Sequence, residues 1–141
     1  MSTGEPQRSA QLVRANLDKL ARVPQSSYDE FAADFRNTEA SLHLLQTAIQ
    51  ALVDLASGIC ASLGLDTPRT SFEVLERLEE DHRLPAGSAK RFAPIVGFRN
   101  RVVHLYDRID PLIVYRVVTE RRSELLDLLD LLLAIDTKGP A

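Results

Sequence analysis

The sequence predicts an all-α protein, an antiparallel bundle of about five helices. Apolar residues recur every three or four positions through most of the chain, and the few Gly and Pro residues cluster between these periodic stretches. No stretch shows the two-residue alternation typical of a β-strand. With 141 residues, the chain has the size of one ordinary domain with a real core. We therefore expect a single domain over residues 1–141, with flexible ends at 1–6 and 136–141.

Two helices are expected in the first half of the chain. The first covers residues 7–23, with apolar positions at Leu12, Val13, Leu17, Leu20 and Val23. Pro24 ends it, and Ser27 is the expected N-cap of a second, long helix from Tyr28 to about Leu63. The inward stripe of this helix includes Phe31 and Phe35. A helix of this length needs a partner along much of its surface.

Three further helices are expected in the second half. The third runs from Phe72 to about His82, with Ser71 as a partial N-cap, and the fourth spans roughly 88–106, with Pro94 and Gly97 inside it. The fifth begins with Asp110 as N-cap and Pro111 at its first position, and runs to about residue 135.

Composition narrows the class of protein. Cys60 is the one cysteine, so no internal disulfide forms, and the absence of a CxxC motif argues against a structural zinc site. This fits a reducing cytoplasm. The N-terminus lacks the pattern of a secretion signal, and no apolar run approaches the roughly 20 residues of a membrane span, so no membrane partner is expected.

The net charge of −3 disfavours a protein that binds nucleic acid through overall charge. Contact with RNA would then need a local basic patch. Six cations lie close together in sequence and are candidates for it: Arg83, Lys90, Arg91, Arg99, Arg101 and Arg108. The alternative is that these are ordinary solvated charges on helix surfaces.

The fourth helix is unusually polar over residues 97–106. It carries Arg99, Asn100, Arg101, His104 and Tyr106, and polar groups inside a buried helix need partners. On a straight helix Arg99 and His104 lie roughly 140° apart, whereas Asn100 and His104 share a face and Arg99 and Tyr106 nearly do. A second copy packed across a two-fold axis would bring the two stripes together, which favours a symmetric homodimer.

These residue types suit cleavage of RNA. The 2′-OH is a built-in nucleophile, and its attack needs a base, an acid for the leaving 5′-oxygen and positive charge on the phosphate. His104 can act as base or acid, Arg99 can hold the phosphate through two parallel hydrogen bonds, and Asn100 can orient either group. This chemistry needs no metal or other cofactor, and the sequence shows no ligand cluster at metal-binding spacing.

The spacing of an Arg five residues before a His, with four residues between them, is weak evidence alone. Arg77 and His82 share it, and we interpret that pair as surface residues at the end of an acidic helix. The alternative interpretation of the second pair is also structural: His104 would be a histidine at the edge of the core that bonds a carbonyl group, with Arg99 in a salt bridge.

The string from Arg99 to Tyr106 resembles the RX4HXY motif of the HepT family in the HEPN superfamily. The flanking Phe72–Leu75, Leu84–Pro85 and Ile109–Asp110 segments and the long preceding helix, with Glu39 near its start, extend the resemblance over about residues 28–135.

This resemblance implies an all-helical homodimeric toxin of a type VII-like toxin–antitoxin pair that cuts RNA without metal. It implies catalytic roles for Arg99 and His104, with Asn100 and Arg101 in support. It also implies a minimal nucleotidyltransferase (MNT) antitoxin that attaches AMP to the motif tyrosine, Tyr106. Two alternatives remain: a catalytically inactive HEPN module that dimerises and partners a nucleotidyltransferase, and a structural helical dimer with a polar interface.

Overall fold

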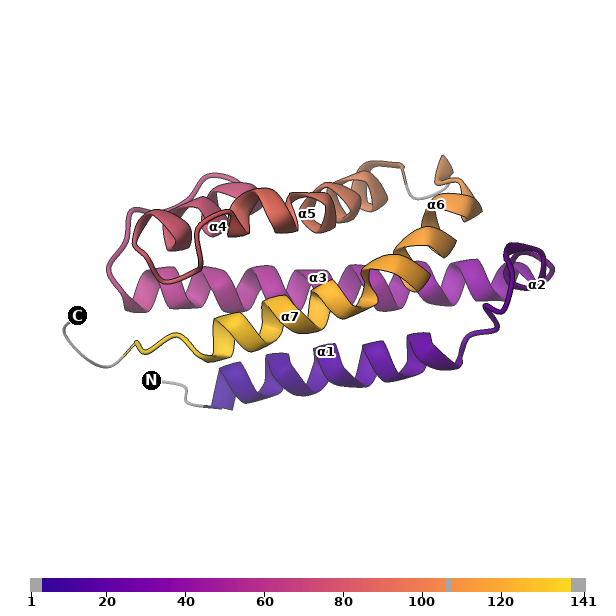
Figure 1. Cartoon of the computed structure of the whole chain (residues 1–141), viewed down its shortest axis with the longest axis horizontal. Helices are drawn as coiled ribbons and strands as arrows, with labels where there is room; N and C mark the ends of the chain where they lie inside the picture. Colours follow the sequence, from indigo (N-terminus) through magenta and orange to yellow (C-terminus); the bar gives the residue numbers. More distant parts are fainter. Residues whose placement is uncertain (1–3, 106–107, 138–141) are drawn as a thin grey trace.

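The computed structural model describes residues 4–105 and 108–137, and these form an all-α bundle around one central helix (Figure 1). The central helix is α3, Phe35–Ser62, which packs against each of the other α-helices. Its neighbours are α1 (Gly4–Arg22), α2 (Tyr28–Ala32), α4 (Ser71–Glu80), α5 (Ser88–Leu105), α6 (Pro111–Arg116) and α7 (Arg122–Leu133). The described residues contain no β-strand, so the predicted fold class is confirmed.

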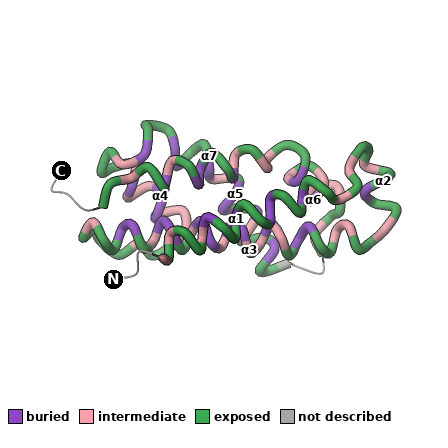
Figure 2. The backbone as a smooth tube through the Cα atoms, turned by 90° about the horizontal axis from the view of Figure 1, so that it is seen from below, coloured by how far each residue is buried: buried purple, intermediate pink, exposed green. Residues whose placement is uncertain are grey.

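The helices are held together by one apolar core that runs the length of the bundle. Buried positions line the inward side of each long helix, as Figure 2 shows, and they come from all parts of the chain. The largest fully buried side chains include Phe31, Phe92, Leu45, Leu52 and Leu129. Asn16 on α1 is buried as well, and its amide donates to the Leu44 carbonyl (3.0 Å) and the Thr47 hydroxyl (2.7 Å) on α3. α1 and α3 are therefore joined by polar as well as apolar contacts.

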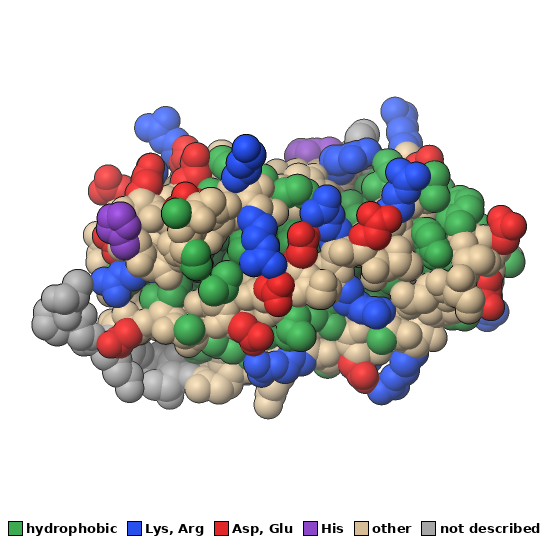
Figure 3. Space-filling view, in the orientation of Figure 1, with side chains coloured by type: hydrophobic (Ala, Val, Ile, Leu, Met, Phe, Trp, Pro, Cys, Tyr) green, Lys and Arg blue, Asp and Glu red, His purple; other side chains and the backbone are tan. Residues whose placement is uncertain are grey.

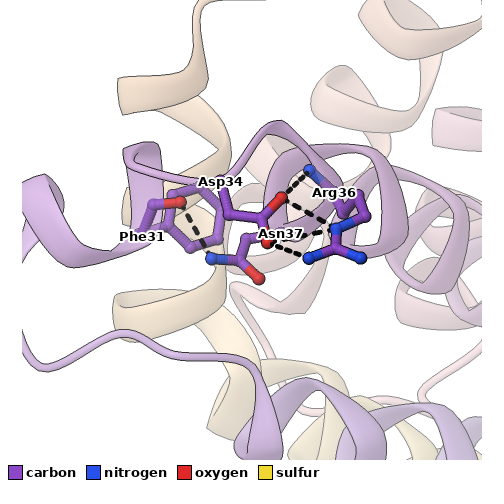
Figure 4. A network of polar contacts seen from close by, with 4 residues as sticks. All are labelled: Phe31, Asp34, Arg36 and Asn37. Atoms are coloured by element: carbon purple, nitrogen blue, oxygen red, sulfur yellow. Dashed lines mark hydrogen bonds and ion pairs between the residues drawn. The ribbon is translucent and has the colours of Figure 1, made fainter.

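The expected long second helix is wrong in one respect, because it is broken into α2 and α3 (Figure 4). Asp34 adopts an extended backbone and caps α3, its carboxylate accepting from the Arg36 backbone N–H (2.9 Å) and from the Arg36 guanidinium. Asn37 donates to the Phe31 carbonyl (3.1 Å) across the break. The helical phase shifts here, so Phe31 is fully buried while Phe35, predicted to face inward, is 74% exposed.

Other boundaries differ by smaller amounts. α1 begins at Gly4, so residues 4–6 are helical rather than a flexible end, and Leu12 of its predicted stripe is 42% exposed. The N-cap of α4 is Thr70, not Ser71, because the Thr70 hydroxyl accepts from the Glu73 N–H. Ser27 caps α2 as predicted.

The last long helix begins as predicted, with Asp110 accepting from the Leu112 N–H (2.9 Å) and Pro111 at its first turn. It is not one regular helix, however. A π-helical turn, Val117–Arg121, separates α6 from α7, and α7 ends at Leu133. Such single wide turns insert one extra residue into a helix, and the apolar periodicity did not reveal it.

α3 is long and apolar enough to cross a membrane by length and composition alone, with a mean hydropathy of 1.4 over its best 18-residue window. No apolar run of that length was expected from the sequence, and α3 corrects this expectation. Half of this window is buried inside the bundle. The position of α3 at the centre of the fold accounts for its apolar character, because a helix surrounded by others is apolar on most sides.

Candidate active site

The polar motif lies on the last three turns of α5. The helix continues through Pro94, which is exposed, so the Lys90 carbonyl that Pro94 cannot bond lies on the solvent side. Phe98 and Val102 are buried and anchor these turns to the core. The polar positions between and after them project to the outer side of the helix, which is why a polar motif can sit on a core helix.

Arg99 reaches from α5 to α3 and is held there by neutral groups. Its Nε donates to Oε1 of Gln50 at 2.9 Å, and its Nη2 donates to the same oxygen. Its Nη1 donates to Oδ1 of the neighbouring Asn100 at 3.0 Å. Three of the five guanidinium N–H groups are thus used, which leaves one on each terminal nitrogen within the described contacts. No carboxylate of the described residues pairs with this half-buried cation.

The orientation of the Gln50 amide is fixed from its other side. Its Nε2 donates to Oδ1 of Asp54, one turn further along α3, at 2.8 Å. Because the nitrogen is committed to a carboxylate, the oxygen must face Arg99. Asn100, Arg99, Gln50 and Asp54 therefore form one chain of hydrogen bonds from α5 to α3. This chain sets the plane and position of the guanidinium.

His104 lies in a different environment. It is exposed, and within the described part of the chain it makes no hydrogen bond or ion pair. Asn100, Val103 and His104 occupy one face of α5, as their spacing requires, and Val103 is 48% exposed between the two polar side chains. The structure does not join Arg99 to His104 directly within one chain. The histidine is not the carbonyl-bonded core residue of the alternative interpretation, and Arg99 is in no salt bridge with a described residue.

The expected basic patch is only partly available. Arg83 pairs with Asp81 (3.0 Å), and Arg91 pairs with Asp127 (2.6 Å) while lying over the Phe92 ring. Four of the six cations make no ion pair with described carboxylates: Lys90, Arg99, Arg101 and Arg108. Figure 3 shows basic and acidic side chains interspersed over the face with α7 toward the viewer. Of these four, Arg99 and Arg101 lie near the end of α5 and Arg108 follows it, whereas Lys90 lies near its start.

The sequence also led to predictions about a modified tyrosine and about metal ligands. Tyr106, the expected modification site, lies outside the described residues. Within residues 4–105 and 108–137, no three His, Cys, Asp or Glu side chains lie together as a set of metal ligands.

Gln50 and Asp54 are site residues that the sequence alone did not indicate. They lie about 50 residues before Arg99, inside the apolar periodicity of a core helix. Their spacing of four places both on one face of α3 together with Thr47. A polar stripe on an otherwise apolar helix is a signal that could have been followed, although it does not say which helix packs against it.

The chain is similar to known proteins in both sequence and structure. Residues 13–132 match the protein-family model described as "Ribonuclease HepT-like". A tRNA nuclease HepT from Aphanizomenon flos-aquae (strain 2012/KM1/D3) is 33% identical over 109 residues, which cover 77% of this chain and 74% of that protein.

Solved structures show the same fold. A tri-AMPylated HEPN toxin from Shewanella oneidensis in complex with its MNT antitoxin has a TM-score of 0.83 and 21% identity, with 95% of this chain and 99% of that chain covered. A toxin–antitoxin structure with AMP-PNP has a TM-score of 0.81 and 20% identity, with 94% and 99% covered. The family match spans most of the bundle and includes the whole α5 motif. The chain therefore belongs to the HepT-like family of ribonucleases, the family that its motif was predicted to represent.

Proposed function

We propose that this protein is the toxin of a toxin–antitoxin pair and acts as a metal-independent endoribonuclease in the cytoplasm. The observation that carries the proposal is the state of Arg99. Two neutral amides hold this half-buried arginine in place. No carboxylate of the described residues pairs with its positive charge. Such a cation is a ready site for a phosphate, because bidentate Arg–phosphate contacts are strong and geometrically defined.

In the proposed reaction, the substrate 2′-OH attacks the adjacent phosphorus and the bond to the 5′-oxygen breaks. His104 takes the proton from the 2′-OH or gives one to the leaving oxygen, and Arg99 stabilises the charge that develops on the phosphate. Asn100 supports Arg99 through its side-chain oxygen, and Arg101, exposed one residue further on, steers the RNA backbone. The products are a 2′,3′-cyclic phosphate and a 5′-hydroxyl.

A homodimer completes this arrangement. Arg99 and His104 are not in contact within one chain, and the face that carries Asn100 and His104 also exposes Val103. Packing this face against a second copy would bury Val103 and bring the histidine of one chain toward the arginine of the other. A two-fold dimer does this with a single self-complementary patch.

The partner in this proposal is an MNT nucleotidyltransferase antitoxin that attaches AMP to Tyr106. A structural neighbour is a HEPN toxin in its tri-AMPylated form with an MNT antitoxin, which supports the same arrangement here. A phosphate and an adenosine added two residues after His104 would place negative charge and bulk where the substrate has to bind.

The deciding experiment is cleavage of a short RNA by the purified protein in EDTA, compared with the same RNA carrying one 2′-deoxy sugar at the cut position. We expect cleavage of the first, resistance of the second and a cyclic phosphate end. Cleavage of the deoxy substrate at the normal rate, or a requirement for added Mg²⁺, would exclude this mechanism.

Toxicity is tested separately by expression in cells. Wild-type protein should arrest growth, and Arg99→Ala and His104→Ala should not. Harmless expression of all three, together with intact RNA in vitro, would favour the inactive dimerisation module instead.

A further inference from the structure

A groove between α1 and α3 opens beside the Arg99 chain of hydrogen bonds. Its volume is about 400 Å³, and it is lined by Glu5, Arg8, Ser9, Leu12, Thr47, Gln50, Ala51 and Asp54. Gln50 and Asp54 belong both to this lining and to the chain that holds Arg99. The groove is therefore separated from the guanidinium by one side chain.

We propose that this groove binds the nucleobase next to the cleaved phosphate, with preference for a base that carries an exocyclic amino group. The inference rests on the proposed ribonuclease function. It specifies which base of the RNA substrate the protein recognises.

Size and chemistry support a base over other occupants. The volume lies within the range of small-ligand sites, whereas a protein interface needs roughly 800 Å² per partner, more than a groove of this size offers. Leu12 and Ala51 give apolar surface for a ring, and Leu12 is 42% exposed, which is unusual for its position on the predicted inward stripe. The Ser9 hydroxyl can donate or accept, whereas the Thr47 hydroxyl already donates to the His43 carbonyl (2.9 Å) and accepts from Asn16 (2.7 Å).

The preference for an amino group follows from Asp54. Its carboxylate uses one oxygen to accept from Gln50 and keeps further acceptor capacity toward the groove. Carboxylates accept from the amino group of cytosine, whereas uracil offers a carbonyl oxygen at that position and would be repelled. Arg8 on the opposite wall makes no hydrogen bond or ion pair within the described residues and can meet a neighbouring phosphate.

The α1 wall of the groove precedes the residues that match the family model. The family match begins at residue 13, whereas Glu5, Arg8, Ser9 and Leu12 precede it. The groove is thus a place where this chain can differ from its relatives in the RNA it selects.

The test is binding, measured by fluorescence anisotropy with 2′-O-methyl tetranucleotides, which lack the nucleophile and are not cleaved. We expect oligonucleotides with cytosine or adenine at the selected position to bind about tenfold tighter than the uracil form. D54N should reduce this ratio to near one, since the neutral amide can face either base edge.

A second variant tests the groove without touching the Arg99 chain. Ser9→Phe places a ring in the groove from α1 and should weaken all oligonucleotides by about tenfold or more, whereas Gln11→Phe on the exposed side of α1 should change nothing. Unchanged binding by Ser9→Phe, or base preference retained by Asp54→Asn, overturns the proposal even if the protein cuts RNA. Lost pairing with a nucleotidyltransferase at unchanged RNA affinity would make the groove a protein interface and overturn it as well. Failure of the wild-type protein to cut RNA would instead overturn the proposed function.

Discussion

The chain contains two arginines placed five residues before a histidine, and the structure gives the two pairs different surroundings. Arg77 and His82 belong to α4 and the turn that follows it, whereas Arg99 and His104 both lie within α5. Arg77 is compensated by Glu80 at 3.5 Å, and Arg99 is bonded to neutral amides. The same spacing therefore produces a neutralised structural cation in one place and an uncompensated cation in the other.

The two histidines differ in backbone as well. His82 has a positive φ of 59° and follows the end of α4, where its N–H donates to the Glu79 carbonyl (3.0 Å) and the Arg83 N–H donates to the Leu78 carbonyl (2.8 Å). This is the Schellman pattern that ends helices. His82 thus holds a turn, and His104 is an exposed helical side chain. The predicted surface position is correct for His82, whereas Arg77 is half-buried with its Nε buried and unbonded among described residues.

The largest expected effect is a difference in ribonuclease activity between variants of the Arg99–His104 pair and variants of the Arg77–His82 pair. Arg99→Ala and His104→Ala should each lower kcat/KM for RNA by about a hundredfold or more, because each removes a group that acts on the reacting phosphate. Arg77→Ala and His82→Ala are the matched controls and should retain activity per folded molecule. Comparable losses in both pairs, with circular dichroism unchanged, would refute the assignment.

A smaller effect should follow from Gln50. Gln50→Leu removes the acceptor that positions Arg99, and we expect kcat to fall about tenfold, with a smaller change in KM. Gln50→Glu should be more damaging, since it supplies the carboxylate that Arg99 otherwise lacks. Gln46→Leu, one turn earlier on α3, is the control. If Gln50→Glu is as active as the wild type, the neutral surroundings of Arg99 have no functional meaning.

A substitution near Arg77 and His82 should change the stability of the fold and leave the activity unchanged. The Glu79 carboxylate accepts from the backbone N–H groups of Gly87 (2.9 Å) and Ala89 (2.8 Å) at the start of α5, and these bonds lower its pKa below the usual 4.5. Glu79→Ala should lower Tm by a few degrees, with kcat unchanged below the transition.

The pH dependence of this contribution has a definite sign. Because the pKa of Glu79 is lowered on folding, its stabilisation is complete above about pH 4.5 and is lost as the pH falls below that value. The Tm difference between wild type and Glu79→Ala should therefore shrink in acid. A difference that stays constant down to pH 3 would contradict this explanation.

The smallest effect concerns His82. His82→Gly relieves the positive φ and should stabilise the fold by about 0.5–1 kcal/mol in urea unfolding, without loss of activity. His104→Gly should do the opposite in both respects, because glycine weakens a helix interior. Destabilisation by His82→Gly would show that its side chain makes a contact that matters.

Much of the fold could be predicted from the sequence, and the errors of that prediction have local causes. The all-α class, the caps at Ser27 and Asp110 and the family were predicted and are confirmed. The break at Asp34 was missed because Phe31 and Phe35 keep helical spacing across it, so the apolar pattern continues although the helix does not. The π-helical turn was missed for a similar reason, since the buried Val118 and Leu125 keep a helical spacing of seven residues across it.

The site was predicted in part. The identities of Arg99, Asn100, Arg101, His104 and Tyr106 came from residue types, spacing and family resemblance, and their catalytic roles stay predictions. The sequence could not indicate that Gln50 and Asp54 meet Arg99, because contacts between residues so far apart depend on how α3 and α5 pack.

The sequence by itself determined which residue types this protein carries, roughly where most of its helices lie and which family it belongs to, because periodicity, caps and motifs are local properties. Only the tertiary structure decided the environment of each side chain. Two identical Arg–His spacings acquired opposite electrostatic surroundings because one arginine meets a carboxylate within its own helix and the other meets a neutral amide from a distant one.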